Sequence, residues 1–228
     1  MRKSILAVAL FSLLTACDYF DPHDHAVLVD SGLGWGSGVV VDGGVLTAAH
    51  VHDVIAKDDD ATLEQYTIHF EGEEYPVTGY EYYGEGGTKT DWVLLHVDIP
   101  AKPAPIYCGD LDNGQRVSVV GYPSAANLPI ELQFHGRISS LDIGDDDKLR
   151  FKNTVGLDLA GAPGISGAGV FNKYGEVIGL YVGGLYHSTQ SHTTGLMTRL
   201  PSEICGEENQ FKLIWDRFIR WVTNSQEG

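Results

Sequence analysis

The chain has 228 residues, of which 43% are apolar, so it is long enough for one large or two small globular units and apolar enough to fold. The 28 glycines and the shortage of helix-forming runs favour many short strands joined by tight turns. The formal charge of −16 argues against a nucleic-acid partner, because so acidic a surface would not displace counterions from phosphates.

A targeting segment opens the chain. Arg2 and Lys3 precede an apolar run at residues 5–14, which is shorter than the roughly 20 residues of a membrane-spanning helix and is typical of a removed signal peptide. Residues 14–17 have the sequence LTAC, which resembles the lipobox of bacterial lipoproteins. The resemblance implies that residues 1–16 are removed and that Cys17 is lipidated. The alternative is an ordinary secretory peptide followed by a chance cysteine.

Lipidation of Cys17 implies a place in the bacterial cell envelope, anchored in a membrane. Asp18 follows it, and in enterobacterial lipoproteins this favours the inner membrane, so a Gram-negative host would hold the domain on the periplasmic side. Residues 17–26 are then a short polar tether. His23 and His25 lie there among aspartates without a distinctive ligand spacing, so we expect a solvated linker and no metal site.

The mature chain shows the pattern of an all-β protein. Residues 38–47 predict a β-hairpin whose turn is Asp-Gly-Gly, and residues 51–57 predict one or two helical turns. Three prolines at residues 99–105 predict a linker that crosses between two halves. Further strands are expected at residues 66–70, 74–80, 92–97, 116–121, 133–140, 148–154, 169–171, 177–182 and 195–199.

Only the C-terminus is predicted to be clearly helical. Apolar residues recur there at steps of three and four, which predicts an amphipathic helix packed on the β core. These residues are Phe211, Ile214, Trp215, Phe218, Ile219 and Val222. The acidic run at residues 142–147 does not have the spacing of a calcium loop, so we expect a solvated turn.

Three local sequences contain the residue types that serine-dependent peptide hydrolysis needs. His50 follows a predicted strand, Asp91 heads an apolar strand, and Ser166 lies in a loop of small residues. The hydroxyl needs a base to take its proton, and the imidazole needs a carboxylate to fix its tautomer. Glycines around the serine allow the N–H groups of Gly164 and Ser166 to point at one spot, which would form an oxyanion hole. Taken singly, the three residues could be a core histidine, a strand cap and a turn serine.

Together these motifs resemble those of the trypsin/chymotrypsin family. The sequence TAAH at residues 47–50 and GISG at residues 164–167 match its histidine and serine motifs, in the family's order His, Asp, Ser. Residues 175–180 and 195–200 resemble the strand after the nucleophile and the last strand before the C-terminal helix. The resemblance covers about residues 37–222, with separations slightly shorter than the family's.

The resemblance implies a fold of two antiparallel six-stranded β-barrels with a C-terminal helix, and an active site in the cleft between the barrels. The first barrel would be residues 27–106, the second 107–204 and the helix 205–228. His50 and Asp91 would come from the first barrel and Ser166 from the second. The implied activity is that of a serine endopeptidase on protein or peptide substrates, without a cofactor, and we expect a monomer.

The sequence departs from the family's pattern at two places near Ser166, and the resemblance implies one disulfide. Where digestive members have the aspartate that binds a new N-terminus, this chain has Ile165, so we do not expect activation by N-terminal insertion. The usual Gly-Gly-Pro after the serine is Gly-Ala-Gly at residues 167–169. Some trypsins have a disulfide at the places of Cys108 and Cys205, which implies that these two cysteines pair. The alternative is two unpaired thiols.

The resemblance also locates a primary substrate pocket. Its floor would be Ala160 beside Gly161, and its walls would include Tyr181, Gly184 and Gly195. No carboxylate occupies the floor to pair with a basic side chain, and the glycines suggest an open pocket, so we expect medium to large apolar residues to be preferred. The alternative is that loop lengths bring Asp158 towards the pocket, in which case basic residues would be preferred. The competing functions are an inactive relative that binds proteins through the same two-barrel surface and a structural envelope lipoprotein.

Overall fold

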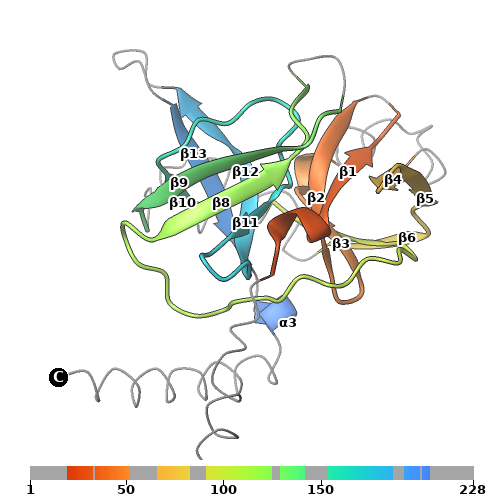
Figure 1. The fold of residues 1–228 in the computed structure, drawn as a ribbon, viewed down its shortest axis with the longest axis horizontal. Coiled ribbons are helices and arrows are strands. Elements are labelled where there is room, and N and C mark those ends of the chain that lie inside the picture. Colours follow the sequence, from red (N-terminus) through yellow and green to blue (C-terminus); the bar gives the residue numbers. More distant parts are fainter. Residues whose placement is uncertain are drawn as a thin grey trace, which may run out of the picture.

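The computed structural model describes residues 20–32, 34–51, 66–82, 91–124, 129–141, 154–186, 193–200 and 202–205. Strands dominate these ranges and gather in two units that lie side by side (Figure 1). The predicted all-β class and its division into two units are therefore confirmed. The segment 1–16, Cys17 and the helices expected at residues 51–57 and 205–228 lie outside the described residues, except for Val51 and Cys205.

Seven antiparallel strands form the first unit. They are β1 (Ala26–Asp30), β2 (Trp35–Val41), β3 (Gly44–Thr47), β4 (Thr67–Phe70), β5 (Glu73–Pro76), β6 (Gly79–Tyr82) and β7 (Val93–His96). The sheet order is β5-β4-β1-β2-β3-β7-β6, so the two edge strands follow each other in the chain. The predicted hairpin is confirmed, because Val41 pairs with Gly44 and leaves Asp42 and Gly43 as a two-residue turn, with Gly43 at φ +90°.

The single strand expected at residues 74–80 is divided into β5 and β6. Between them, the Val77 N–H donates to the Tyr66 carbonyl at 3.2 Å, and the Thr78 N–H donates to the His96 carbonyl at 2.9 Å. The chain therefore changes its partner from one side of the sheet to the other at residues 77–78. The first unit is therefore a curled sheet of seven strands in which β5 and β6 are the two halves of one expected strand, and this is consistent with the predicted double barrel.

The second unit is a closed barrel of six strands, as predicted. Its strands are β8 (Arg116–Gly121), β9 (Leu132–Ser140), β10 (Thr154–Leu157), β11 (Gly169–Phe171), β12 (Val177–Tyr186) and β13 (Thr193–Arg199), in the order β10-β13-β12-β11-β8-β9. Every pair is antiparallel. A cluster of buried side chains that includes Val119, Leu157 and Met197 fills the barrel.

A second set of buried side chains joins the two units. Leu46 and Trp92 from the first unit pack in one cluster with Phe171 and Leu180 from the second. The proline-rich segment crosses between the units as expected: the Ala104 N–H donates to Val40 in β2, and the Val177 N–H in β12 donates to Pro105, both at 2.8 Å. These contacts fix the position of the catalytic candidates on one unit relative to those on the other.

The predicted solvated tether is wrong from residue 20 onward, where Phe20 already contacts the folded domain. Residues Pro22–His25 form a 3-10 helix, η1, in which Asp21 caps the first turn by accepting from the His23 N–H at 3.1 Å. His25 is 2% exposed, and its Nδ1 donates to the carbonyl of Lys102 at 2.8 Å. The partner lies 77 residues away in the sequence, so the local composition does not indicate this contact. No group of three or more potential metal ligands occurs among the described residues.

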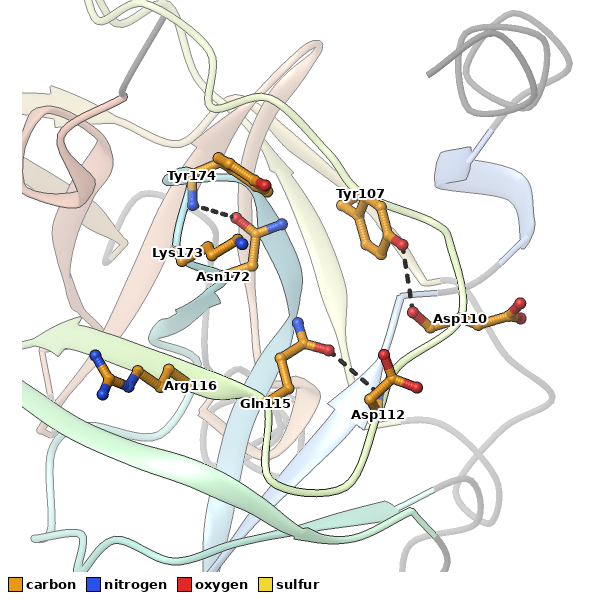
Figure 2. Close-up of a pocket in the computed structure, with 8 residues that line it drawn as sticks. All are labelled: Tyr107, Asp110, Asp112, Gln115, Arg116, Asn172, Lys173 and Tyr174. Carbon is orange, nitrogen blue, oxygen red and sulfur yellow. Dashed lines mark hydrogen bonds between the residues drawn. The ribbon is translucent and has the colours of Figure 1, made fainter. Parts of the chain in front are cut away.

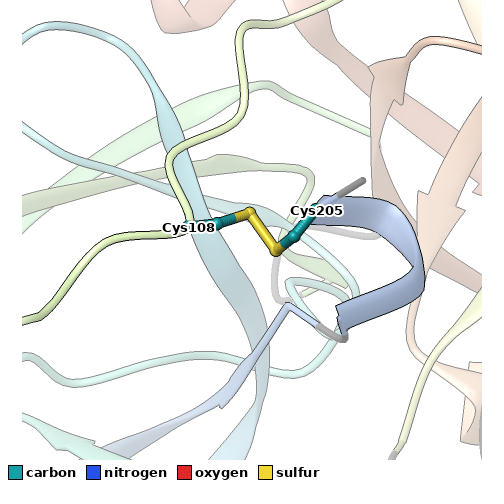
Figure 3. The surroundings of a disulfide bond; sticks show 2 residues. All are labelled: Cys108 and Cys205. Carbon is teal, nitrogen blue, oxygen red and sulfur yellow. A yellow bond between two sulfur atoms is a disulfide. The ribbon is translucent and has the colours of Figure 1, made fainter. Parts of the chain in front are cut away.

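Cys108 and Cys205 form a disulfide. It joins the end of the crossing segment to the short helix α3 (Ser202–Cys205), as Figure 3 shows. The loop closed by this bond spans 97 residues, so on the chain-entropy model the bond stabilises the folded state by about 4–5 kcal/mol.

Candidate active site

Strand pairing brings His50 and Asp91 to the same end of the first unit. Thr47 at the end of β3 pairs with Val93 at the start of β7. Because the pair is antiparallel, the chain that continues from Thr47 to His50 runs beside the chain that precedes Val93 at Asp91. His50 lies in a short helical turn after β3, as its motif predicted.

The Asp91 carboxylate accepts two hydrogen bonds from His50. The ring Nδ1 lies 2.5 Å from Oδ2, and the backbone N–H of His50 donates to Oδ1 at 2.8 Å. Asp91 is 7% exposed, whereas the side chain of His50 is 40% exposed. A buried carboxylate is costly unless it is hydrogen-bonded, and here both oxygens have a partner. The pair therefore fixes the tautomer and the direction of the imidazole while the ring remains accessible.

Ser166 occupies a turn whose backbone conformation requires glycine at positions 164 and 167. Gly164 and Gly167 have φ of +93° and +85°, a region that other residues rarely adopt. A Cβ on Gly164 would lie 2.5 Å from the Tyr122 carbonyl oxygen. A Cβ on Gly167 would lie 2.2 Å from both the Ser37 carbonyl oxygen and the Thr47 hydroxyl. Backbone conformation and lack of space therefore require glycine two residues before Ser166 and directly after it.

A buried serine on β2 holds this turn in place, and sequence reasoning did not identify it. The N–H of Ser37 donates to the Ser166 carbonyl at 2.8 Å, and its hydroxyl donates to the Gly164 carbonyl at 2.8 Å. The same hydroxyl accepts from the Tyr122 N–H at 2.9 Å, and the Ser37 carbonyl accepts from Thr47 at 2.7 Å. Ser37 is fully buried and links the strand pair that leads to His50 with the turn that presents Ser166.

The backbone N–H groups around Ser166 divide into two sets. Ile165, Gly167 and Ala168 donate to the carbonyls of nearby residues at 3.3, 2.7 and 3.0 Å. In the part of the chain that the structure describes, no hydrogen bond uses the N–H of Gly164 or Ser166 as donor. These are the two groups expected to form the oxyanion hole, and both remain available to an external oxygen.

His50 and Ser166 line one cavity of about 160 Å³ between the two units. Val51 and Gly164 contribute to its wall. Ser31, Gly34 and Trp35, which sequence reasoning did not select, complete the wall on the side of β2. The structure therefore brings His50 and Ser166 to a common space, with Asp91 buried behind His50.

A larger cavity of about 350 Å³ lies at the other end of β11. Asn172, Lys173 and Tyr174 follow β11 directly and face Gln115 and Arg116 across it, as Figure 2 shows. Ser166 precedes β11, so this cavity is separate from the candidate site. The described residues that line it include no serine, histidine or cysteine, so they supply none of the nucleophiles or bases of the first cavity.

Four of the five expected pocket residues come together, and the ring of Tyr181 lies against two of the glycines. A Cβ on Gly161 would lie 1.9 Å from the hydroxyl oxygen of Tyr181, and a Cβ on Gly195 would lie 3.0 Å from Cε2 of the same ring. Gly184 pairs with Gly195 across β12 and β13. Ala160 is exposed at the outer end of the loop. The glycines make room for the ring of Tyr181, which occupies part of the space that the sequence leaves for the pocket.

Two β-units, with a histidine–carboxylate pair on one and a glycine-flanked serine on the other, define the class of trypsin-like serine peptidases. A family model described as "Trypsin-like peptidase domain" matches residues 36–180, and the chain belongs to this family. It is accordingly a serine endopeptidase by class. No curated protein sequence matches the chain.

Solved structures of the Rv3671c protease from M. tuberculosis have the same fold. Its active form is 20% identical, with a TM-score of 0.60 over 78% of this chain and 77% of that one. An inactive form is also 20% identical, with a TM-score of 0.59 and coverage of 78% and 84%. An inactive serine-to-alanine mutant from strain H37Rv is 19% identical, with a TM-score of 0.60 and coverage of 78% and 82%. At this identity the likeness supports the fold alone.

Among the described residues, no helix is both long and apolar enough to cross a membrane.

Proposed function

We propose that the chain hydrolyses peptide bonds through an acyl-enzyme on Ser166, with His50 as general base and Asp91 as its orienting carboxylate. The observation that supports this most is the double hydrogen bond from His50 to the buried Asp91, together with the cavity that His50 shares with Ser166. The substrates are proteins or peptides, as the family implies.

The first half of the reaction forms the acyl-enzyme. The Ser166 hydroxyl oxygen attacks the carbonyl carbon of the scissile bond while Nε2 of His50 takes the hydroxyl proton. Asp91, hydrogen-bonded to Nδ1, stabilises the positive charge that develops on the ring. The N–H groups of Gly164 and Ser166 bind the negative oxygen of the tetrahedral intermediate. Nε2 then returns the proton to the leaving amine, and the carbon–nitrogen bond breaks.

The second half repeats these steps with water as the nucleophile. His50 takes a proton from the water, whose oxygen attacks the ester carbon, and the proton goes to the Ser166 oxygen as the acid product leaves. With this water as co-reactant, the protons and electrons of both halves balance.

Ile165 explains how the nucleophile turn keeps its shape without a charged partner. It is fully buried in the core of the second unit, next to the turn. The turn is anchored there by this apolar side chain and on its other side by the hydrogen bonds of Ser37. This arrangement supports an enzyme that folds directly into its active form, without cleavage at an N-terminus.

The N-terminal contacts support a short membrane tether. Phe20, three residues after Cys17, donates its N–H to the Tyr174 carbonyl at 3.3 Å, and the ammonium of Lys102 lies 4.8 Å from the centre of its ring. Three extended residues reach only about 10 Å. A lipid on Cys17 would therefore hold the domain close to the envelope membrane, on the periplasmic side of the inner membrane in a Gram-negative cell.

Hydrolysis of an unfolded protein tests the activity. The domain should cleave it to peptides, and Ser166→Ala should not. Binding of the unfolded protein by both forms without cleavage by either would favour a protein-binding relative over an enzyme.

Membrane fractionation tests the anchor separately. The wild-type chain should sediment with membranes, because two or three acyl chains hold a protein stably at a bilayer. A Cys17→Ser variant behind a different signal peptide should be released as soluble domain. An N-terminal Cys17 without lipid in mass spectrometry would exclude the anchor and leave the proposed activity untouched.

A further inference from the structure

Beyond Tyr181, β12 has a backbone edge on which an extended substrate can lie. The pairing of β11 with β12 ends at Gly169 and Leu180, whereas the pairing of β12 with β13 continues to Tyr186. Among the described residues, the edge at residues 182–185 has no partner strand on the side of β11. An added strand takes its main-chain hydrogen bonds from such an edge.

This edge leads directly to Ser166. The Tyr181 N–H donates to the Ala168 carbonyl at 2.8 Å, and the Gly167 N–H donates to the Tyr181 carbonyl at 2.7 Å. A peptide paired along residues 182–185 therefore ends beside the nucleophile. The side chain that precedes its scissile bond would enter between β12 and the loop at residues 161–164.

The ring of Tyr181 occupies that entrance. Its hydroxyl touches the backbone of Gly161 and its ring edge faces Gly195, the two positions where the absence of a Cβ would otherwise leave space. Tyr181 is 3% exposed and packs with Ile165 and Met197 in the core of the second unit. Both of its backbone polar groups are bonded to the nucleophile turn, so the ring is a fixed wall rather than a movable flap.

Resting on the proposed function, we propose that Tyr181 closes the primary pocket and restricts cleavage to bonds that follow small, uncharged residues such as glycine, alanine and serine. A leucine or phenylalanine at this position would overlap the ring, and forcing extra carbon atoms into packed space is destabilising. A basic residue would find no carboxylate among the pocket residues, and leaving a charge unpaired in such a site is costly. An acidic residue would be disfavoured because it would be repelled by a chain with a formal charge of −16.

The tyrosine hydroxyl does not alter this selectivity with pH. Burial raises the pKa of Tyr181 to about 12, so the hydroxyl is uncharged at neutral pH. Tyr181 therefore adds no charge to the pocket at neutral pH.

The test is a panel of peptides that differ only in the residue before the scissile bond. For the wild-type domain, kcat/KM should be highest for alanine and at least about 10–200-fold lower for leucine and phenylalanine, since one methylene already changes the rate by that factor. Tyr181→Ala should reverse the order, because it vacates the space of the ring. Tyr181→Val serves the same purpose if the alanine variant does not fold.

Tyr181→Phe is the matched control, because it keeps the ring and removes only the hydroxyl. It should retain the preference for small residues; a change of order in this variant would contradict exclusion by size. Faster wild-type cleavage after leucine, phenylalanine or arginine than after alanine would overturn the inference. A fluorophosphonate titration of each protein counts active sites first, so a wild-type domain that is not labelled at all refutes the proposed function rather than only its specificity.

Discussion

The two units hold their catalytic candidates by different means. In the first unit, His50 and Asp91 are positioned by hydrogen bonds that involve the reacting side chains themselves. In the second unit, Ser166 is positioned through its backbone, by the glycines beside it and by Ser37 on a strand of the other unit. Side-chain substitutions in the first unit should therefore remove chemistry without unfolding, whereas those around Ser166 should change stability and geometry together.

Asp91→Asn should have the largest effect on activity. The amide would donate to Nδ1 of His50 rather than accept from it, so the ring would hold its proton on the wrong nitrogen, and kcat should fall by about 10⁴-fold. Unfolding in urea should show a native-like cooperative transition. Asp98→Asn is the matched control, because it removes the same charge from a position just beyond β7. Equal activity of both variants would exclude Asp91 from the mechanism.

Gly167→Ala should give the largest loss of stability. Comparison with Gly114→Ala separates the effect of backbone strain from that of lack of space. Gly114 has φ of +80°, but a Cβ added there would meet no heavy atom within 4 Å. Strain alone should cost about 1–2 kcal/mol at Gly114. At Gly167, overlap with Ser37 and Thr47 should add about 1–3 kcal/mol. Urea denaturation measures both, and equal losses would mean that the turn is not tightly packed.

Ser37→Ala should produce a smaller, mixed effect. It removes the donor to the Gly164 carbonyl and the acceptor for the Tyr122 N–H, and each buried group left without a partner costs about 1–3 kcal/mol. If Ser37 positions the oxyanion turn, kcat should also fall while KM changes little. Ser118→Ala on β8 is the control, because Ser118 makes no side-chain hydrogen bond in the described ranges. A loss of stability with unchanged kcat would make Ser37 purely structural.

His23 should give the smallest effect, and one that depends on pH. Its hydrogen bond to Glu131 raises its pKa above 6.5, against burial, which lowers it; the charges of Glu131 and Asp21 and a hydrogen bond to Gln133 also raise it. Because the pKa is raised on folding, this stability is fully present below pH 6.5 and is lost as the pH rises through the folded-state value. For so exposed a pair we expect about 0.2–1 kcal/mol.

Urea denaturation at about pH 5.5 and about pH 8.5 measures the His23 contribution as the difference between wild type and His23→Gln. The difference should be present at the lower pH and absent at the higher one. A difference that is equal at both pH values would mean that the ion pair with Glu131 does not form in solution. Glu131 also accepts a hydrogen bond from the Tyr122 hydroxyl at 2.8 Å, so His23 connects η1 to the segment beside the nucleophile turn.

The features that follow from local sequence were predicted well. A hairpin needs only its turn residues and flanking strands, so β2 and β3 were predicted nearly to the residue. The histidine and carboxylate were predicted because each stands beside an apolar strand, and antiparallel pairing of those two strands brings them together. Most strands of the second barrel follow from alternating apolar runs between turn signals.

The features that were missed depend on contacts between distant segments. Ser37 is one small residue between two glycines, and only its position against Gly164, 127 residues later, gives it a role. The docking of His25 on Lys102 is of the same kind. Gly184 and Gly195 indicated space in the pocket, but the sequence does not say which side chain lies in that space. Tyr181 fills it because barrel closure places its ring between two strands and a loop that are far apart in the chain.

Reaction with a fluorophosphonate, followed by peptide mapping, tests the central claim that Ser166 is a nucleophile activated by His50 and Asp91. The account predicts one adduct per chain, on the peptide that contains Ser166. It predicts no adduct in Ser166→Ala, a rate lower by several orders of magnitude in His50→Ala, and an unchanged rate in Ser118→Ala. A folded wild-type domain that forms no adduct, or forms it at another residue, would contradict the account.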